Sequence, residues 1–263
     1  MSKSKVVVLA GGTGGAKLAR GMLDVIGPDE LVVIANTGDD IDIYGAHVSP
    51  DPDLVSFWLA DEIDERGWGL RGDTFMVMDA LRALGVDVWF NLGDRDLAWC
   101  LQRRHLRDEG LSPTEALARL NGAIGVRAQV LPVSDEHQPT RVRTGTGWHT
   151  FQEFMIRNRA AGPVCEVSFG EHETSPVPAT TQALAALSDA RAVIVGPSNP
   201  VISIWPILHV LGDVLDDLAA PVVCVSPVVG GKIVKGPTAD FLAAYGQPAS
   251  AAGVLAFYER VHP

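Results

Sequence analysis

The sequence predicts an α/β protein: a doubly wound, Rossmann-like parallel sheet with a smaller mixed α/β insertion in the middle third. Two observations support this fold class. Continuous apolar runs alternate with stretches of helical apolar periodicity, which is typical of strands that helices cover on both faces. Polar, glycine-containing segments follow several of these runs, as expected at the carboxyl ends of parallel strands, where such sheets bind ligands. The length of 263 residues suits one large domain or two small ones, and we expect a single domain over residues 1–263.

Six apolar runs are predicted strands, at residues 6–10, 31–36, 88–92, 128–132, 192–196 and 222–226. Eight amphipathic stretches are predicted helices, at residues 16–26, 54–64, 74–84, 96–109, 113–120, 178–188, 204–218 and 239–244. Residues 141–151 and 164–169 differ from both and are predicted as an antiparallel hairpin between the two halves of the sheet. An inserted subdomain is therefore expected at about residues 110–177.

Composition excludes several classes of protein. The net charge of −11 argues against a general nucleic-acid binder, whose affinity depends on neutralising phosphates. No apolar run reaches membrane-spanning length, and the first residues lead into a predicted core strand and not into a signal peptide. The three cysteines are widely spaced, which excludes a Cys-x-x-Cys metal site and fits reduced thiols. We therefore expect a soluble, cytoplasmic protein.

The first predicted strand ends in the glycine-rich segment GGTGGAKL. Gly11, Gly12, Gly14 and Gly15 would let backbone N–H groups face an anion at the start of a helix, and Lys17 would add a positive charge. The alternative is a tight turn without a ligand. Four glycines in five positions exceed what a turn needs, so we predict a phosphate-binding loop.

This segment matches neither of the two common phosphate-binding motifs. A Walker A loop requires a glycine where Ala16 stands and a hydroxyl where Leu18 stands. A dinucleotide-binding fingerprint requires a third glycine where Lys17 stands. The predicted ligand is therefore a phosphate group, held by a glycine-rich loop that follows neither motif.

Carboxylates follow the second predicted strand and precede the next predicted helix. Asp39 and Asp40 come after Gly38, and hard oxygen ligands at a strand end suit Mg²⁺. The alternative is an acidic turn with side-chain caps. Asp51 and Asp53 flank a proline, and one of them is expected to cap the helix while the other is free for a metal or a substrate hydroxyl.

A third polar segment, NLGDRDLAW, follows the predicted strand at residues 88–92. Asn91, Asp94, Arg95 and Asp96 lie here, and Gly93 marks a tight turn into a helix. Arg95 would clamp a carboxylate or phosphate bidentately, or pair with its acidic neighbours.

Two polar loops lie in the second half of the chain. Ser198, Asn199 and Ser203 stand among prolines that fix the backbone, so this loop is suited to reading a base edge or a sugar. A glycine pair followed by Lys232 and Lys235 is predicted as a second anion-binding loop. The histidines lack metal-ligand spacing, and no Ser-His-Asp set can be assigned.

Taken in order, these motifs resemble the 2-phospho-L-lactate transferase family of coenzyme F(420) biosynthesis. The matching segments cover residues 6 to about 237: GGTGGAKL, NTGDD, SPDPDLVSF, RGWG, GDT, LGDRDLA, LPVSDE, TFQEF, GPSNPVISIWPIL and SPVVGGKIVKGP. The sequence departs from the family pattern at Leu54, where the family has threonine, and at Pro52, which would shift a carboxylate. The family continues beyond FYERVHP with a further strand and helix. We expect that segment to be absent here and a sheet edge to be left unpaired.

The resemblance implies a reaction. The family transfers the phosphate that bears a small acid from a guanosine diphosphate ester to the ribityl terminal hydroxyl of the deazaflavin Fo, with release of GMP. The product is F(420)-0 or its dehydro form, and the acid is lactate, enolpyruvate or glycerate. The resemblance further implies Mg²⁺, small-molecule substrates, no nucleic-acid or membrane partner, and a homodimer.

The resemblance also implies roles for individual residues. The expected nucleotide-binding residues are Gly11, Gly12, Thr13, Gly14, Gly15, Lys17, Ser198, Asn199, Ser203 and Lys232. The expected metal ligands are Asp39 and Asp40. The expected substrate-binding residues are Asp51, Asp53, Asn91, Asp94 and Arg95, and the expected catalytic residues are Asp39, Asp53, Asp94 and Arg95. Asp53 is the favoured general base, if the reaction needs one.

Two other classes of protein share parts of the pattern. Regulators of the gluconeogenesis-factor type bind nucleotide sugars through a similar GGTG loop, but a pure binder does not need the acidic GDRD segment. A nucleotide-dependent oxidoreductase would place an acidic residue at the end of the second strand to bind the ribose, where this chain has Asn36.

Overall fold

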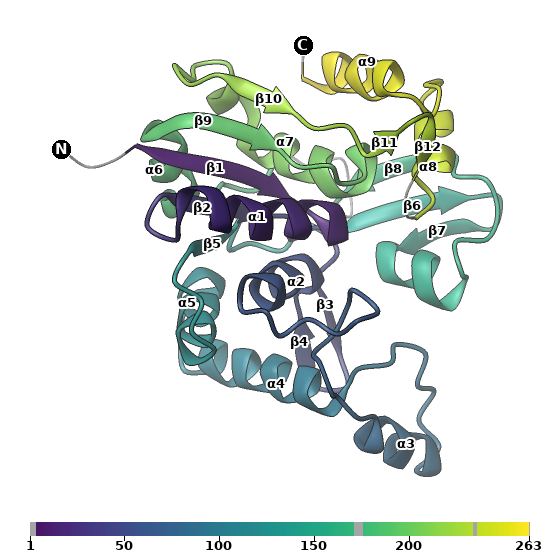
Figure 1. Ribbon diagram of the computed structural model, residues 1–263. Coiled ribbons are helices and arrows are strands. Elements are labelled where there is room, and N and C mark those ends of the chain that lie inside the picture. Colours follow the sequence, from purple (N-terminus) through teal and green to yellow (C-terminus); the bar gives the residue numbers. More distant parts are fainter. Residues whose placement is uncertain (1–3, 171–175, 234–235, 263) are drawn as a thin grey trace.

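The computed structural model describes residues 4–170, 176–233 and 236–262. A five-stranded parallel sheet lies at its centre, in the order β10-β9-β1-β2-β5 (Figure 1). The strands are β1 (Lys5–Ala10), β2 (Leu31–Ala35), β5 (Gln129–Pro132), β9 (Ala190–Val195) and β10 (Val222–Cys224). The chain adds strands on one side of β1 and then on the other, which confirms the predicted doubly wound, Rossmann-like α/β class. The strand order therefore reverses between β1 and β9, where such sheets bind ligands.

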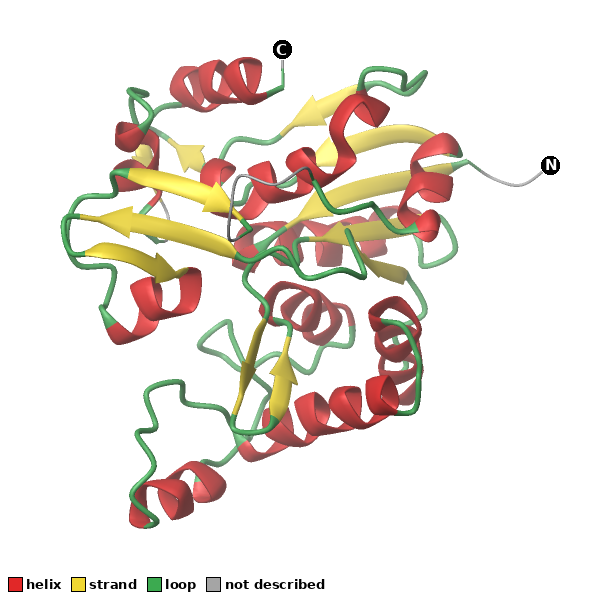
Figure 2. Ribbon diagram, turned by 180° about the vertical axis from the view of Figure 1, so that it is seen from behind, coloured by secondary structure: helices red, strands yellow, loops and turns green. Residues whose placement is uncertain are grey.

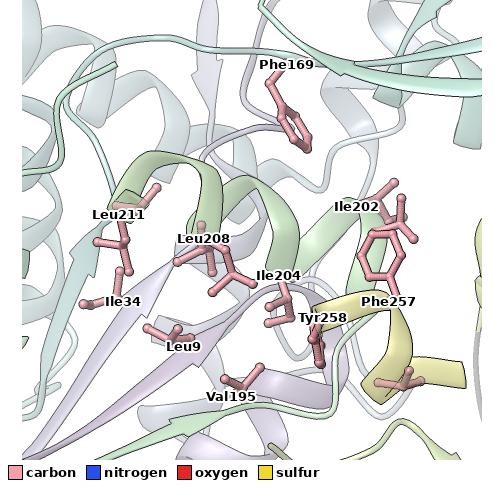
Figure 3. Packing of buried hydrophobic residues seen from close by; sticks show 14 of the residues in the cluster. Leu9, Ile34, Phe169, Val195, Ile202, Ile204, Leu208, Leu211, Phe257 and Tyr258 are labelled. Atoms are coloured by element: carbon pink, nitrogen blue, oxygen red, sulfur yellow. The ribbon is translucent and has the colours of Figure 1, made fainter. Parts of the chain in front are cut away.

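Helices cover both faces of the sheet, because the apolar side chains of each strand alternate between two cores. Val7 and Leu9 pack with α6 (Thr181–Ser188), α7 (Trp205–Leu211) and α9 (Ala251–Val261). Figure 3 shows this core, with Leu9 and Val195 of the sheet facing Ile204 and Leu208. Val8 and Ala10 pack on the other side with α1 (Gly12–Ile26), α2 (Pro50–Leu59), α4 (Asp94–Asp108) and α5 (Pro113–Ala123). The continuous apolar runs are thus explained by burial on both faces.

A long excursion between β2 and β5 lies to one side of the central sheet (Figures 1 and 2). It contains the hairpin of β3 (Ile41–Ile43) and β4 (Ala46–Val48), then α2, α3 (Met76–Ala83), α4 and α5. A separate antiparallel sheet of β7 (Gly147–Thr150), β6 (Thr140–Thr144) and β8 (Glu166–Phe169) follows β5 and confirms the predicted hairpin. Residues 171–175 of the predicted insertion at 110–177 lie outside the described residues, and its boundaries stay a prediction.

The predicted strand at residues 88–92 is wrong. Residues 88–92 form no strand, and β5 already occupies the edge of β2. The Phe90 N–H donates instead to the Tyr44 hydroxyl, at 3.2 Å. Phe90 and Leu92 are buried in the core beneath α2 and α4, which accounts for the apolar run without a sheet.

The second half differs from the prediction at two helices. The expected helix at 204–218 is a π-helical turn (Pro200–Ile204), then α7, then a 3₁₀ turn (Gly212–Leu215), because Pro206 interrupts helical hydrogen bonding and Gly212 has φ of +50°. Helix α9 was not predicted. The remaining elements are the hairpin of β11 (Val228–Val229) and β12 (Lys232–Ile233), the helix α8 (Thr238–Ala244), and a π-helical turn at Glu153–Arg157.

Two expectations from composition can be compared with the fold. Within the described residues, no helix is both long enough and apolar enough to cross a membrane. Cys100, Cys165 and Cys224 all carry free thiols.

Candidate active site

The glycine-rich segment forms the first turn of α1, directly after the central strand. Gly11 precedes the helix, and Gly12 begins it with φ of +60°, a conformation that favours glycine. The backbone N–H groups of Gly11 and Gly15 donate to Ser198 Oγ, at 3.3 and 3.0 Å. The Gly12 N–H donates to Asp51 Oδ1. The turn is therefore tied to the loop after β9 and to the start of α2.

Close packing explains several of the glycines. A Cβ on Gly14 would clash with the carbonyl of Pro197, and one on Gly15 would lie 2.7 Å from Ser198 Oγ. A Cβ on Gly11 would lie 2.6 Å from the Cβ of Ser203. The glycines therefore allow the two loops to touch, a role that composition alone did not indicate.

A cavity of about 300 Å³ lies between this turn, the loop after β9 and the segment before α8. Its size is within the range of small-molecule sites. Every predicted nucleotide-binding residue except Gly15 and Lys232 lines it: Gly11, Gly12, Thr13, Gly14, Lys17, Ser198, Asn199 and Ser203. Lys232 is exposed in β12, and Lys235 is outside the described residues. Asn199 also caps the following turn, since its Oδ1 accepts from the Val201 N–H at 3.0 Å.

Two buried carboxylates meet beside this cavity. Asn36 Nδ2 donates to Asp51 Oδ2 at 2.9 Å and to Asp39 Oδ1 at 3.3 Å. Burial and the charges of Asp51 and Asp40 raise the pKa of Asp39 well above its usual range. Burial also raises the pKa of Asp51, to about 6, although Asn36 and Gly12 donate to it. The two negative charges therefore repel each other, and binding of a cation or a proton between them is favoured.

Asp40 faces a different set of partners from Asp39. Its Oδ1 accepts from Ser49 Oγ at 2.7 Å, and its Oδ2 lies 3.4 Å from His47 Nε2. Asp39 and Asp51 thus share one partner, the Asn36 amide, whereas Asp40 contacts Ser49 and His47.

Asp53 forms a buried ion pair with a residue that the sequence motifs did not indicate. Its Oδ1 accepts from Arg103 Nη2 and from Trp99 Nε1, the latter at 2.8 Å, while its Oδ2 has no hydrogen-bond partner among the described residues. Arg103 Nη1 donates to the carbonyl of His47 at 3.0 Å. Burial raises the pKa of Asp53 and the charge of Arg103 opposes that rise. The only feature of the sequence that could have indicated this ion pair is the spacing of Trp99 and Arg103, which places both side chains on one face of a helix.

A second cavity, of about 410 Å³, opens between α2 and residues 89–92. Its walls are mainly aromatic and apolar, and the predicted substrate-binding residues Asp51, Asp53 and Asn91 line it. Asp96 lines it as well, and burial together with the charges of Asp53 and Asp73 raises its pKa to about 7. The apolar side chains of this cavity are Phe57, Trp68, Trp89, Phe90, Leu54 and Ile156, among others. A flat aromatic ring with a few polar atoms would fit these walls.

Asp94 and Arg95 lie outside both cavities. Asp94 accepts from the Met76 and Val77 N–H groups at 3.1 and 3.0 Å, so it caps α3. The Arg95 guanidinium donates to the Arg71 carbonyl at 2.6 Å and to Glu62 at 3.2 Å. Their predicted catalytic and substrate-binding roles gain no support from these contacts and stay predictions.

Asp73 caps α4 in the same way as Asp94 caps α3. It accepts from the N–H groups of Arg95 and Asp96, at 2.8 and 3.1 Å, and so caps α4. The GDT and GDRD segments therefore cap each other's helices.

The fold and the site define a class of protein: an α/β protein with a glycine-rich helix start and a cavity where its sheet order reverses, the place where such folds bind phosphate-containing ligands. The family model described as 2-phospho-L-lactate transferase CofD matches residues 6–259. The chain belongs to this family.

Similar proteins carry two related names. A 2-phospho-L-lactate transferase from Methanospirillum hungatei is 37% identical, over 96% of this chain and 85% of that protein. One from Methanothermobacter thermautotrophicus is 39% identical, over 97% and 82%. A phosphoenolpyruvate transferase from Kitasatospora aureofaciens is 39% identical, over 97% and 81%. A crystal structure of a Bacillus halodurans protein shares the fold, with a TM-score of 0.59, 19% identity, and 96% of this chain and 78% of that one covered.

Proposed function

We propose that this protein transfers an acid-bearing phosphate group from a guanosine diphosphate ester to the deazaflavin Fo in coenzyme F(420) biosynthesis. One observation carries the proposal: a hydrogen bond at the first turn of α1 connects the walls of the two cavities. Gly12 lines one cavity and donates to Asp51, which lines the other. The guanosine diphosphate would occupy the smaller cavity, and the flat deazaflavin the aromatic one.

The reaction joins the contents of the two cavities. The terminal ribityl oxygen of Fo attacks the phosphorus that bears the acid, and a new P–O bond forms. The bond from that phosphorus to the bridging oxygen breaks, and GMP leaves with the electron pair. The hydroxyl proton passes to a carboxylate or to water. Such transfers depend on positioning and charge neutralisation more than on a strong nucleophile.

We propose that Asp39 and Asp51 hold Mg²⁺ together with the diphosphate. Two protein carboxylates plus phosphate oxygens and water are typical of Mg²⁺ sites. The buried, mutually repelling carboxylates suit a divalent cation, whereas Asp40, also predicted as a ligand, already contacts Ser49 and His47. The ion would neutralise charge on the diphosphate.

The chain's own groups would position the substrates. The dipole at the start of α1 would attract the diphosphate, with Lys17 adding a charge. The N–H groups of Gly11, Gly12 and Gly15 would position the turn, since they donate to Ser198 and Asp51. Asp53 lines the aromatic cavity and has one carboxylate oxygen without a partner among the described residues, so we propose that it orients the ribityl chain.

The transferred acid is left open between lactate, enolpyruvate and glycerate, since relatives carry both lactate and enolpyruvate names. A cytoplasmic homodimer is also proposed, from the family resemblance and the composition.

The nucleotide specificity tests this function against its alternatives. We expect GDP with Mg²⁺ to raise the melting temperature by several degrees, because a ligand that binds only the folded state stabilises it. A UDP-sugar and NADH should produce no comparable shift. A shift with the UDP-sugar alone would favour a nucleotide-sugar regulator, and a shift with NADH alone an oxidoreductase.

A further inference from the structure

A third hollow meets the first turn of α1. It is an open groove of about 770 Å³ between that turn and the loop at residues 63–71. Thr13 and Lys17 line both this groove and the nucleotide cavity. The loop approaches the turn closely, since a Cβ on Gly67 would lie 4.0 Å from Thr13 Cγ2. The groove therefore opens directly from the place where we position the diphosphate.

Three cationic side chains line this groove, together with the carboxylates of Asp64 and Glu65. Lys17 Nζ lies 5.4 Å from the ring centroid of Trp58, and among the described residues no carboxylate is within ion-pair distance of it. Arg66 Nε pairs with Asp64 at 2.6 Å, while its two terminal amino groups have no hydrogen-bond partner in the described part of the chain. Arg71 also lines the groove. The groove thus offers donors suited to a small anion.

The Arg66 side chain also contacts the wall of the aromatic cavity. Its guanidinium lies 4.3 Å from the ring centroid of Trp68, which lines that cavity. Stacking on an aromatic ring fixes the plane of the guanidinium while leaving its edge available to a ligand. Arg66 therefore lies between the groove and the aromatic cavity.

The geometry of phosphoryl transfer requires a third compartment. The attacking and leaving oxygens lie roughly in line on opposite sides of the phosphorus. The acid is bonded to the same phosphorus, so it must project sideways from that line. The nucleotide and aromatic cavities would take the leaving and attacking groups, and the groove is a third hollow, which shares Thr13 and Lys17 with the nucleotide cavity.

We infer that this groove binds the acid portion of the donor, with Arg66 and Arg71 contacting its carboxylate. The inference rests on the proposed function and adds a substrate subsite to it. Each of the three acids carries one carboxylate, so the subsite would recognise the class. The groups around the groove would then decide between a methyl, a methylene and a hydroxymethyl.

The test is a kinetic comparison of Arg66→Gln with wild type. We expect the KM for the guanosine diphosphate ester to rise about 10- to 100-fold, as for loss of a charge-assisted hydrogen bond. The KM for Fo and the affinity for GDP, which lacks the acid, should stay within about threefold, a difference worth well under one such bond. Arg71→Gln should raise the same KM and provides a second variant if Arg66→Gln does not fold.

Arg127→Gln is the matched control. Arg127 is a surface arginine, with 70% of its side chain exposed, at the amino end of β5 and thus at the opposite edge of the sheet. An ester KM that is unchanged in Arg66→Gln and Arg71→Gln, with wild type active, would overturn this inference alone. So would an equal loss of GDP affinity, since the groove would then serve the nucleotide. Absence of product from wild type with all three esters would overturn the proposed function as well.

Discussion

At the residue scale, the surroundings of Asp96 change its acid–base chemistry. It lies beside the aromatic cavity, where the acidic groups Asp53 and Asp73, the Cys100 thiol and the Arg103 guanidinium face it. Burial and the two carboxylates raise its pKa to about 7, and Arg103 opposes that rise. The folded state therefore holds this proton more tightly than the unfolded chain does.

This raised pKa predicts a pH dependence of stability. Stability is lost as pH rises from the ordinary aspartate pKa of about 4 towards the folded value, because the folded state must give up a proton that it favours. Asp96→Asn removes this loss. We expect its free energy of unfolding, relative to wild type, to increase by roughly 2–3 kcal/mol between pH 5 and pH 8.

Chemical denaturation at both pH values measures the effect. Asp108→Asn, at an exposed position of the same helix, is the control and should show little pH-dependent difference. If Asp96→Asn and wild type differ by the same amount at pH 5 and pH 8, Asp96 titrates normally and our description of its environment is wrong.

At the scale of elements, the start of α1 depends on close approach to the loop after β9. Gly14→Ala would place a methyl group against the carbonyl of Pro197. We expect a loss of about 1–3 kcal/mol of stability and weaker GDP binding, because the two loops must separate. Gly21 lies in the same helix, and a Cβ added there would meet no atom within 4 Å, so Gly21→Ala should stabilise by about 0.5–1 kcal/mol.

Thermal unfolding of both variants separates packing from helix propensity. A Gly14→Ala variant that is as stable as Gly21→Ala, with GDP affinity retained, would show that the contact with Pro197 is not needed.

Much of the fold was predictable because apolar periodicity reports burial. The strands of the central sheet and the order of the helices follow from it, and so does the antiparallel hairpin. The apolar run at residues 88–92 was wrongly predicted as a strand because an apolar run indicates burial of the side chains, and not hydrogen bonding to a neighbouring strand. Helix α9 was missed although Val254, Phe257 and Tyr258 have helical spacing and are buried on one face.

The candidate site was predictable only for parts that a short, continuous segment of the chain forms. The glycine turn and the loop after β9 are recognisable by composition, and the structure brings them together in one cavity. The pairing of Asp39 with Asp51, the Asp53–Arg103 ion pair and the reciprocal caps of Asp73 and Asp94 depend on contacts between distant segments. Residue spacing carries no information about such contacts.

At the scale of the whole molecule, two of the three hollows open at the first turn of α1, and Asp51 of the acidic pair links that turn to the third. This arrangement, in a chain whose net charge is −11, places the few cations that line these hollows where a diphosphate ester would bind. On the proposed function, the protein therefore holds three parts of one reaction around a single phosphorus atom.

The most direct test is product formation. The protein is mixed with Fo, Mg²⁺ and each of the three guanosine diphosphate esters, and mass spectrometry follows GMP and a phosphorylated deazaflavin. We predict equal amounts of both products from at least one ester, and a loss of about 100-fold or more in Asp51→Asn or when a chelator removes the metal. Binding of Fo and GDP without either product, under conditions where the folded protein is intact, would contradict the proposed function.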